Sequence, residues 1–459
     1  MKSIYKILGL ILTLSIGGTG CDSYFEDYIA SPNNPSSATP ALMLSSIEIA
    51  TFASYGGQLA RQSSVMTQQM AGTSAGSQSI EIAQYNITEL TNENEWNTIY
   101  AGAISDGNAL ISLYGDENPW YAGISKVLLA LNFGLATDLW GNIPFDEAGV
   151  GILQPAYESQ EVVLGKIQTL LSEAITDLQS PASSNSLFPT TDDFIFEGDV
   201  AKWISTAYVL KARYANRLSA IDPTGSATDA LSYITSANMT ETDDCNMIFA
   251  GGTALNQWND YEASRPSYMR VCETFVDVLT ASSDPRLPVL LSKDANGGYS
   301  GTPFDDVDVL ATSYVGDYYA SEDSPIPLVS YVESKFIEAE AQLRLSNASD
   351  AATAYNEAVS ASILKITGAS DVAYEGVYAS ETAATITLEK IMNQKWIALF
   401  IQVESYSDWR RTGFPVLTPN PDGLVTGIPV RLITPQNERL YNPVAEVYGN
   451  LLDPVWWDK

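Results

Sequence analysis

Long segments with apolar residues at helical spacing most constrain the fold of this chain. The clearest spans residues 160–178, where apolar side chains recur every three or four positions. These side chains are Val163, Leu164, Ile167, Leu171, Ile175 and Leu178. Comparable spacing is found over residues 93–114, 119–139, 199–218, 332–345, 351–364 and 385–406. Because each stripe must be buried against another element, the pattern predicts a mainly α protein built from packed helices.

Two of these segments form a pair of the tetratricopeptide type. Residues 332–345 and 351–364 are joined by the short linker SNASD. Alanines at 339, 341, 354 and 358 allow the two helices to approach closely. The pairs 93–114 with 119–139 and 160–178 with 199–218 are further candidates, although their linkers are less regular.

The middle of the chain has a different composition. Residues from about 240 to 331 are rich in Gly, Pro, Asn and Asp, and we predict one clear helix there, over residues 267–281. Long ordered loops in a compact protein usually carry function, so we expect the ligand-binding part here. Residues 420–459 are Pro-rich and are predicted to pack on the surface as an irregular tail.

The N-terminus has the pattern of a bacterial lipoprotein signal. Lys2 and Lys6 precede the apolar run 7–16, and small residues lead to Cys21. We expect cleavage before Cys21 and lipid attachment to it; plain secretion, with Cys21 incidental, is the alternative. Removal of residues 1–20 would leave a lipidated tether over residues 21–40 and one domain over residues 41–459. No other stretch of the sequence is predicted to span a membrane.

The net charge is strongly negative. The chain has 23 Lys and Arg against 55 Asp and Glu, a formal charge of −32. Loss of Lys2 and Lys6 with the signal would bring it to −32 − 2 = −34. Such a surface repels nucleic acid and other anionic polymers, so nucleic acid is not an expected partner. A neutral ligand fits this charge better.

Several chemistries are excluded by residue content. The chain has no histidine, which rules out a Ser-His-Asp triad, a Cys-His pair and nearly all zinc chemistry within the chain. No phosphate-binding glycine motif is present, and we expect no cofactor. Besides Cys21, the cysteines are Cys245 and Cys272, which either pair with each other or stay as buried thiols.

The charged motifs favour structural roles. Residues 138–148, DLWGNIPFDEA, are interpreted as a turn, because adjacent Asp146 and Glu147 point apart. Glu338 and Glu340 lie about 200° apart on a helix and do not share a face. Residues 294–305 resemble a calcium loop only partly, since the required sixth-position glycine is missing, and we expect no metal. Two arginines, Arg410 and Arg411, suit the C-terminus of a helix that Gly413 ends.

An aromatic cluster in the loop-rich part is the candidate ligand site. Sugar rings stack their C–H faces on aromatic rings, and their hydroxyls need planar polar partners. Residues 258–268, WNDYEASRPSY, supply both, with Asn256, Asp260 and Arg265 close by. Trp96 follows the loop at 70–95, although its helix stripe also fits the core. The ligand-binding candidates are Trp258, Asn259, Tyr261, Trp96, Tyr299 and Tyr318.

Ordered segments along the whole chain together resemble the SusD/RagB-like outer-membrane lipoproteins of Bacteroidetes, in the branch that ends in a Trp-Trp-Asp tail. The segments are the signal through Cys21, PNNPSSATPALML, WNTIYAGAISDGNAL, DLWGNIPFDEA, WISTAYVLKARYANRL, RPSYMRVCETFVDVL, SSDPRLP, SKFIEAEAQLRL, QKWIALFIQVESYSDWRRTGFP, RLITPQNERLYNP and DPVWWDK. Each segment alone is modest, whereas their order from end to end is specific.

The resemblance implies a fold and a role. The fold would be a right-handed superhelical scaffold of tetratricopeptide-like helix pairs that supports a loop-rich irregular part with few short strands. The role would be capture of glycans, or less often peptides, at the cell surface for a SusC-like TonB-dependent transporter, without enzymatic activity. Ligand residues vary in the family, so none is transferred. Two other classes stay open, a helical glycoside hydrolase with two carboxylates and a structural or adhesive surface protein.

Overall fold

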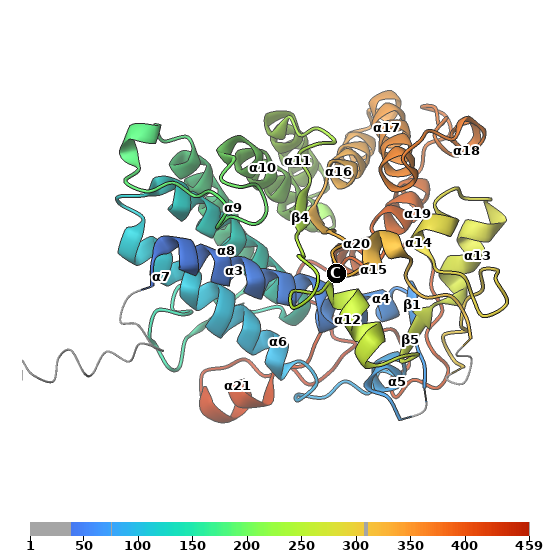
Figure 1. Cartoon of the computed structure of the whole chain (residues 1–459), viewed down its shortest axis with the longest axis horizontal. Coiled ribbons are helices and arrows are strands. Elements are labelled where there is room, and N and C mark those ends of the chain that lie inside the picture. Colours follow the sequence, from blue (N-terminus) through green and yellow to red (C-terminus); the bar gives the residue numbers. More distant parts are fainter. Residues whose placement is uncertain (1–37, 75, 307–310, 459) are drawn as a thin grey trace, which may run out of the picture.

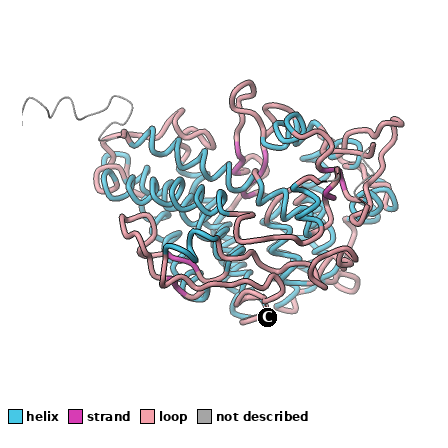
Figure 2. Tube along the Cα trace, turned by 90° about the horizontal axis from the view of Figure 1, so that it is seen from below, coloured by secondary structure: helices cyan, strands magenta, loops and turns pink. Residues whose placement is uncertain are grey.

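The computed structural model describes residues 38–74, 76–306 and 311–458 of the chain (Figure 1). The predicted signal peptide 1–20, the lipidation site Cys21 and nearly all of the tether lie outside the described residues. Helices make up most of the described chain, which confirms the mainly α prediction. Short strands occur as separate pieces between long loops (Figure 2).

The N-terminal helices surround one long buried helix. Helix α3 begins where the Thr39 side chain accepts a hydrogen bond from the Leu42 amide and Pro40 takes the first helical position. The elements that follow are α4 (Gln58–Met66), α5 (Gln78–Ala83), α6 (Glu93–Asn97), η1 (Thr98–Ile104), α7 (Ser105–Tyr114) and α8 (Pro119–Trp140), with α3 at Pro40–Gly56. The helix predicted over residues 93–114 is therefore α6, η1 and α7 in sequence, with a π-helical middle.

Helix α8 passes through the core. By length and composition alone it is the one described helix suited to crossing a membrane, contrary to the sequence prediction that no such segment follows the signal. Its most apolar window is 94% buried inside the structure, so neighbouring helices cover this surface. The contact with α10 (Val200–Asn216) is particularly close, because the Tyr214 hydroxyl lies against Gly134 and donates to the Ala130 carbonyl.

The helix pair predicted at 332–345 and 351–364 forms, whereas the earlier pairs are shifted by one helix, because an additional helix that was not predicted spans Pro223–Ala237. Side-chain caps start several of these helices, among them Ser159, Asp199, Asp222 and Ser330. The elements are α9 (Gln160–Leu178), η2 (Ala182–Ser184), α10 (Val200–Asn216), η3 (Arg217–Ser219), α11 (Pro223–Ala237), α16 (Tyr331–Arg344), α17 (Ala348–Thr367), α18 (Val372–Tyr378), α19 (Leu388–Ala398) and α20 (Glu404–Thr412). Helices α8 and α9, α10 and α11, and α16 and α17 pack side by side, giving the tetratricopeptide-like scaffold.

The prediction of one long helix over residues 385–406 is wrong in the middle of that segment. The chain leaves helical geometry between α19 and α20, where Ile401 has a φ of 62°. The buried Gln69 side chain accepts from the Ile401 amide at 2.9 Å and donates to the Trp396 carbonyl at 2.8 Å. A partner more than 300 residues away thus satisfies the backbone groups that the break frees.

The loop-rich part holds more regular structure than predicted. Besides α13 (Glu273–Ala281), it contains α12 (Gln257–Ser264), α14 (Leu287–Leu290), α15 (Asp317–Ala320) and the strands β4 (Cys245–Met247), β5 (Met269–Val271) and β6 (Ile326–Val329). Strand β4 pairs with β6, and β5 pairs with β1 (Met70–Gly72), both antiparallel. A third antiparallel pair joins β2 (Ile143–Pro144) to β3 (Tyr157–Glu158).

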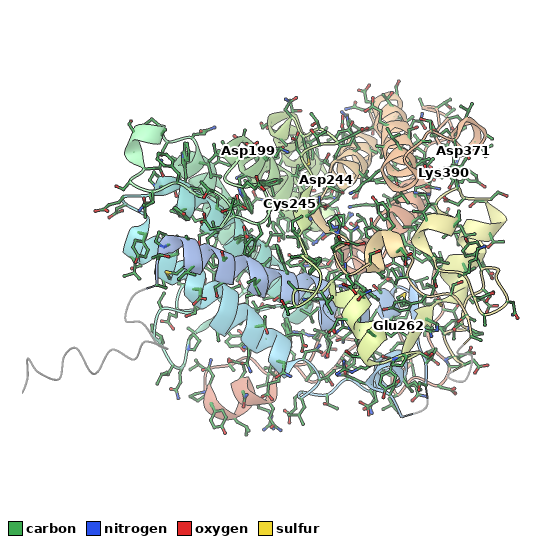
Figure 3. All side chains as sticks on the ribbon, viewed as in Figure 1. Asp199, Asp244, Cys245, Glu262, Asp371 and Lys390 are labelled. Carbon is green, nitrogen blue, oxygen red and sulfur yellow. The ribbon has the colours of Figure 1, made fainter. Side chains whose placement is uncertain are left out.

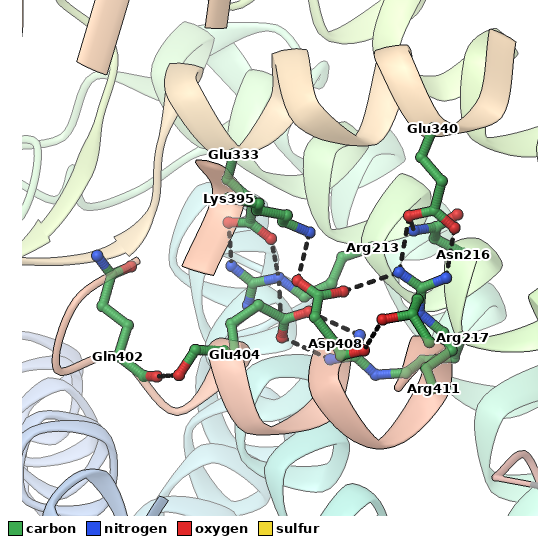
Figure 4. A network of polar contacts seen from close by, with 12 residues as sticks. Arg213, Asn216, Arg217, Glu333, Glu340, Lys395, Gln402, Glu404, Asp408 and Arg411 are labelled. Carbon is green, nitrogen blue, oxygen red and sulfur yellow. Dashed lines mark hydrogen bonds and ion pairs between the residues drawn. The ribbon is translucent and has the colours of Figure 1, made fainter. Parts of the chain in front are cut away.

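A network of buried charges links the scaffold helices (Figure 4). Arg213 on α10 forms a two-bond pair with Glu333 on α16, with distances of 2.6 and 2.7 Å. Arg217 binds Glu404 on α20 through both terminal nitrogens, at 2.5 and 2.6 Å. The other members are Asp138, Asn216, Glu340, Lys395, Asp408 and Arg411, so α8, α10, α16, α19 and α20 all contribute.

The C-terminal segment closes the core rather than only covering the surface. After α21 (Gln436–Tyr441) the chain runs back to α8, and Trp457 is fully buried. Its indole nitrogen donates to the Asp138 carboxylate at 3.0 Å. Arg410 lies on the Trp457 ring and donates to the Asp138 carbonyl, so the predicted turn at 138–148 is anchored by distant residues.

The smaller motifs have structural roles. Cys245 and Cys272 are separate buried thiols, which decides between the two options left open by the sequence. Asp294 accepts hydrogen bonds from the amides of Asn296 and Gly298 and from the Ser300 hydroxyl, so its carboxylate holds the shape of its own loop. Gly413 ends α20 in the left-handed region, at a φ of 74°.

Candidate ligand-binding site

The loop-rich part is attached to the N-terminal helices through α12. Asn256 caps this helix, accepting from the amides of Trp258 and Asn259. Its side-chain amide donates to the carbonyls of Tyr319 and Ser324, at 3.0 and 2.7 Å. One buried asparagine therefore both starts α12 and fixes its position against α15 and the segment before β6.

Tyr261 on α12 faces a pocket of about 320 Å³ (we call it the polar pocket). Figure 1 shows α12 beside α4, and Figure 3 marks Glu262 on this helix. The pocket is lined by Ala53, Gly57, Gln58, Arg61, Glu95, Thr98, Gln257, Asp260, Tyr261 and Arg265. Residues from α3, α4, α6, η1 and α12 thus meet here. A size of a few hundred Å³ suits a small ligand or one unit of a larger one.

The Tyr261 ring is held between charged groups. The Arg61 guanidinium carbon is 4.2 Å from the ring centroid, and that of Arg265 is 5.5 Å from it. The Tyr261 hydroxyl is 2.7 Å from the Ser79 hydroxyl, which fixes the ring orientation. Cation–π contacts of this kind leave the guanidinium N–H groups free to bind something else.

Some polar groups of the pocket have no protein partner, whereas Gln58, Thr98 and Asp260 do. Among residues 38–74, 76–306 and 311–458, the side chains of Arg61 and Arg265 make neither a hydrogen bond nor an ion pair. One oxygen each of Glu95 and Gln257 is buried without a hydrogen bond. Burial lowers the pKa of the Arg61 guanidinium and raises that of the Glu95 carboxyl. Buried polar groups are normally satisfied, so this pocket is prepared for a polar ligand.

An apolar hollow of about 590 Å³ adjoins the polar pocket, and we call it the apolar pocket. The two share Ala53 and Gln257 in their linings. Phe52, Phe194 and Phe249 give the second hollow its aromatic surface, under the segment 248–255. The two pockets are therefore neighbours at Ala53 and Gln257, one with a polar lining and the other with an apolar lining.

Of the six predicted ligand residues, Tyr261 alone lines the polar pocket. The Trp258 ring is fully buried in the core, and Trp96 stacks on Tyr100 at 4.4 Å. Asn259 donates its amide to the Ala320 carbonyl, and the Tyr318 hydroxyl donates to the Lys365 carbonyl. Tyr299 packs half-buried against the core at another place. The structure thus does not bring these five side chains together with Tyr261 around one pocket.

Arg61 and Glu95 are the residues that sequence reasoning missed. Arg61 is the only charged residue from 49 to 80, which was a usable signal. A lone cation in an uncharged helical segment needs a reason to be there. Glu95 precedes Trp96 and had no distinguishing feature, because its importance depends on α6 lying opposite α12.

Another hollow, of about 330 Å³, lies beside the C-terminal segment. Trp456 and Tyr448 line it, together with Arg431. The Arg431 guanidinium carbon lies 3.7 Å from the Tyr448 ring centroid, and its N–H donates to the Trp140 carbonyl. Since these groups already bind one another, the polar pocket is the stronger candidate site.

Comparison with known proteins gives the family. A family model described as "Starch-binding associating with outer membrane", SusD-like, matches residues 32–435. The chain belongs to this SusD-like family. No curated protein matches the chain. The expected SusD/RagB resemblance is therefore confirmed, and with it the association of the family with the outer membrane.

Solved structures share the fold. A SusD/RagB family protein from Bacteroides thetaiotaomicron is 23% identical with a TM-score of 0.79, over 92% of this chain and 99% of its own. A chitin-binding protein is 24% identical with a TM-score of 0.77, over 92% and 100%. A chitin-binding SusD homologue from Flavobacterium johnsoniae is 20% identical with a TM-score of 0.78, over 91% and 98%.

Proposed function

We propose that this SusD-like protein binds oligosaccharides or polysaccharides at the cell surface. The observation that carries the proposal is the polar pocket beside the Tyr261 ring, where Arg61, Arg265 and one oxygen each of Glu95 and Gln257 have no protein partner. An aromatic face with convergent donors and acceptors fits a sugar ring and its hydroxyls. The description of the family as starch-binding and two chitin-binding structural neighbours support the same class of ligand.

The proposal includes delivery to a partner. Lipid on Cys21 would hold the domain 41–459 at the outer membrane, and a SusC-like TonB-dependent transporter would receive the captured glycan. Support for these steps comes from the lipoprotein-like signal and from the family description. Labelling with a radioactive fatty acid tests the anchor, with Cys21→Ala as control. Co-purification of a TonB-dependent barrel tests the partner.

A binding experiment tests the main proposal. Residues 22–459 are run in affinity electrophoresis and calorimetry against soluble starch, chitin oligosaccharides, other polysaccharides and peptides. We expect binding of at least one glycan and a loss of about tenfold or more in Tyr261→Ala, as for removal of a stacking ring with its polar neighbours. Tyr441→Ala, which removes an exposed tyrosine far from the pocket, serves as the control. Binding of peptides alone contradicts the proposal.

A glycoside hydrolase is the second candidate, because Glu95 and Asp260 line the same pocket. Burial raises the pKa of Glu95, as a general acid requires. The densest carboxylate cluster is less suited: burial opposes ionisation of Glu340 and Glu404, yet the arginines facing them hold both pKa values below the ordinary one. Reducing ends released by the wild-type chain and lost in Glu95→Gln would establish hydrolysis and displace the capture proposal.

A further inference from the structure

Nearly all Lys and Arg side chains in the described part of the chain form ion pairs or hydrogen bonds within the protein, except in the polar pocket. Among the described residues, the Lys and Arg side chains with neither an ion pair nor a side-chain hydrogen bond are Arg61, Arg265 and Lys293. Lys293 is exposed on a loop. Arg61 and Arg265 lie in one pocket, on one tyrosine ring. In a chain with 55 acidic residues, two unpaired arginines at one place are a distinct arrangement.

Leaving the Arg61 guanidinium unpaired is energetically unfavourable, so its position in the pocket requires a physical reason. The Arg61 side chain is half-buried and Arg265 is exposed, and no carboxylate oxygen of the described residues lies within 4.0 Å of the Arg61 guanidinium. A desolvated charge is unfavourable unless it is paired and hydrogen-bonded. Five N–H donors on each guanidinium have the fork geometry that matches a carboxylate or a sulfate.

The carboxylates of the pocket limit what can bind. Asp260 lies in the first turn of α12 and accepts a hydrogen bond from Ser264. Glu95 interacts electrostatically with Arg61 without forming an ion pair, and one of its carboxylate oxygens has no hydrogen bond. These groups disfavour a dense polyanion, as does the net charge of −32. At physiological ionic strength the Debye length is about 8–10 Å. Acidic surface groups farther away than this therefore interact only weakly with a ligand group that contacts the arginines.

We infer that the polar pocket binds a glycan through an acidic substituent, a carboxylate or a sulfate, clamped by Arg61 and Arg265 beside the Tyr261 ring. This inference rests on the proposed glycan-binding function and changes the expectation of a neutral ligand drawn from net charge. The acidic group takes the free guanidinium donors, and the sugar ring that carries it occupies the polar pocket beside them.

Matched polymers test the inference with the full chain purified in detergent. The pairs are polygalacturonate and its methyl ester, alginate and its propylene glycol ester, and chondroitin sulfate and desulfated chondroitin. In at least one pair we expect the acidic member to bind about tenfold more tightly, with the preference weakening as salt rises. The esterified pairs report a carboxylate, and the chondroitin pair reports a sulfate.

Variants locate the effect. Arg61→Gln and Arg265→Gln should each remove the preference for the acidic member, so that binding of the acidic member falls by about tenfold more than binding of the neutral member. Arg61→Lys should keep part of the preference, because the charge remains without the fork. Lys293→Gln, which removes an unpaired cation outside the pocket, should change nothing. An unchanged circular-dichroism spectrum and melting temperature show that each variant is folded.

The contrary outcomes are separable. Equal binding of both members in every pair, or a preference unchanged in Arg61→Gln and Arg265→Gln, overturns the acidic-group inference and leaves glycan binding intact. Absence of binding to these polymers and to every neutral glycan overturns both the inference and the proposed function.

Discussion

The helical scaffold and the loop-rich part satisfy their polar groups in different ways. In the scaffold, Arg213, Arg217 and Arg411 are buried and paired with carboxylates of other helices. Around α12, side-chain amides such as that of Asn256 bind backbone carbonyls, and the arginines beside Tyr261 stay unpaired. Charges paired inside the protein hold helices together, whereas charges left unpaired at a pocket are available to a ligand.

Breaking the scaffold network should give the largest effect. Glu404→Gln leaves Arg217 and Arg213 without their shared carboxylate, which should lower the free energy of unfolding by about 3–5 kcal/mol. Urea denaturation measures this. Because the folded pKa of Glu404 is depressed, its contribution is present at neutral pH and is lost as pH falls through that pKa. Glu89→Gln, which breaks the exposed pair with Arg439, should leave the midpoint unchanged.

A second effect depends on pH and concerns Glu48, a buried residue of α3 that accepts a hydrogen bond from the Phe194 amide. Burial, with the nearby Asp193 carboxylate, raises the pKa of Glu48 to about 10 from its ordinary 4.5. The folded state therefore keeps a proton that the unfolded state releases, and stability falls as pH rises from about 4.5 towards 10. From pH 5 to pH 7 wild type should lose up to about 3 kcal/mol relative to Glu48→Gln.

Stability curves at several pH values measure the Glu48 effect. Glu173→Gln, on the exposed face of α9, should follow the wild-type pH profile. A difference between wild type and Glu48→Gln that does not vary with pH would mean that Glu48 titrates normally.

Overpacking tests the close helix contact inside the scaffold. A Cβ at Gly134 would lie 1.9 Å from the Tyr214 hydroxyl oxygen, so Gly134→Ala should lower the free energy of unfolding by about 1–3 kcal/mol. Gly165→Ala on α9 is the matched change, because a Cβ there meets no atom within 4 Å. It should instead stabilise by up to about 1 kcal/mol through helix propensity. Equal effects in the two variants would contradict the packing argument.

Loss of the α12 cap should have the smallest effect on stability, and its effect on glycan binding should be larger than its effect on stability. Asn256→Ala removes the cap and should cost about 1–2 kcal/mol in the free energy of unfolding. Since α12 carries Tyr261 and Arg265, glycan affinity should fall as well, measured by calorimetry. Asn347→Ala, at the start of α17 without a side-chain cap bond, should change neither.

The scaffold was predictable from sequence because its helices carry local signals. Residues 160–178 form a helix at the predicted bounds, with the Ser159 cap directly before it. The break at Ile401 was not predictable, because Gln69 makes it possible from across the molecule. Contacts between distant segments also limited prediction of the site. Local composition indicated Tyr261, but it equally indicated Trp258, whose ring is buried in the core. Arg61 was missed because it reaches the pocket from α4, far away in the sequence.

The hydrogen bond between Trp457 and Asp138 has a consequence for how the chain reaches its native state. These residues are 319 positions apart, and Asp138 also receives the Arg217 side chain. A long loop must close before this contact forms, which costs entropy and slows folding. Helix α8 therefore obtains its last partner only after residue 457 has been synthesised. We expect the scaffold to remain incompletely folded until that indole is in place.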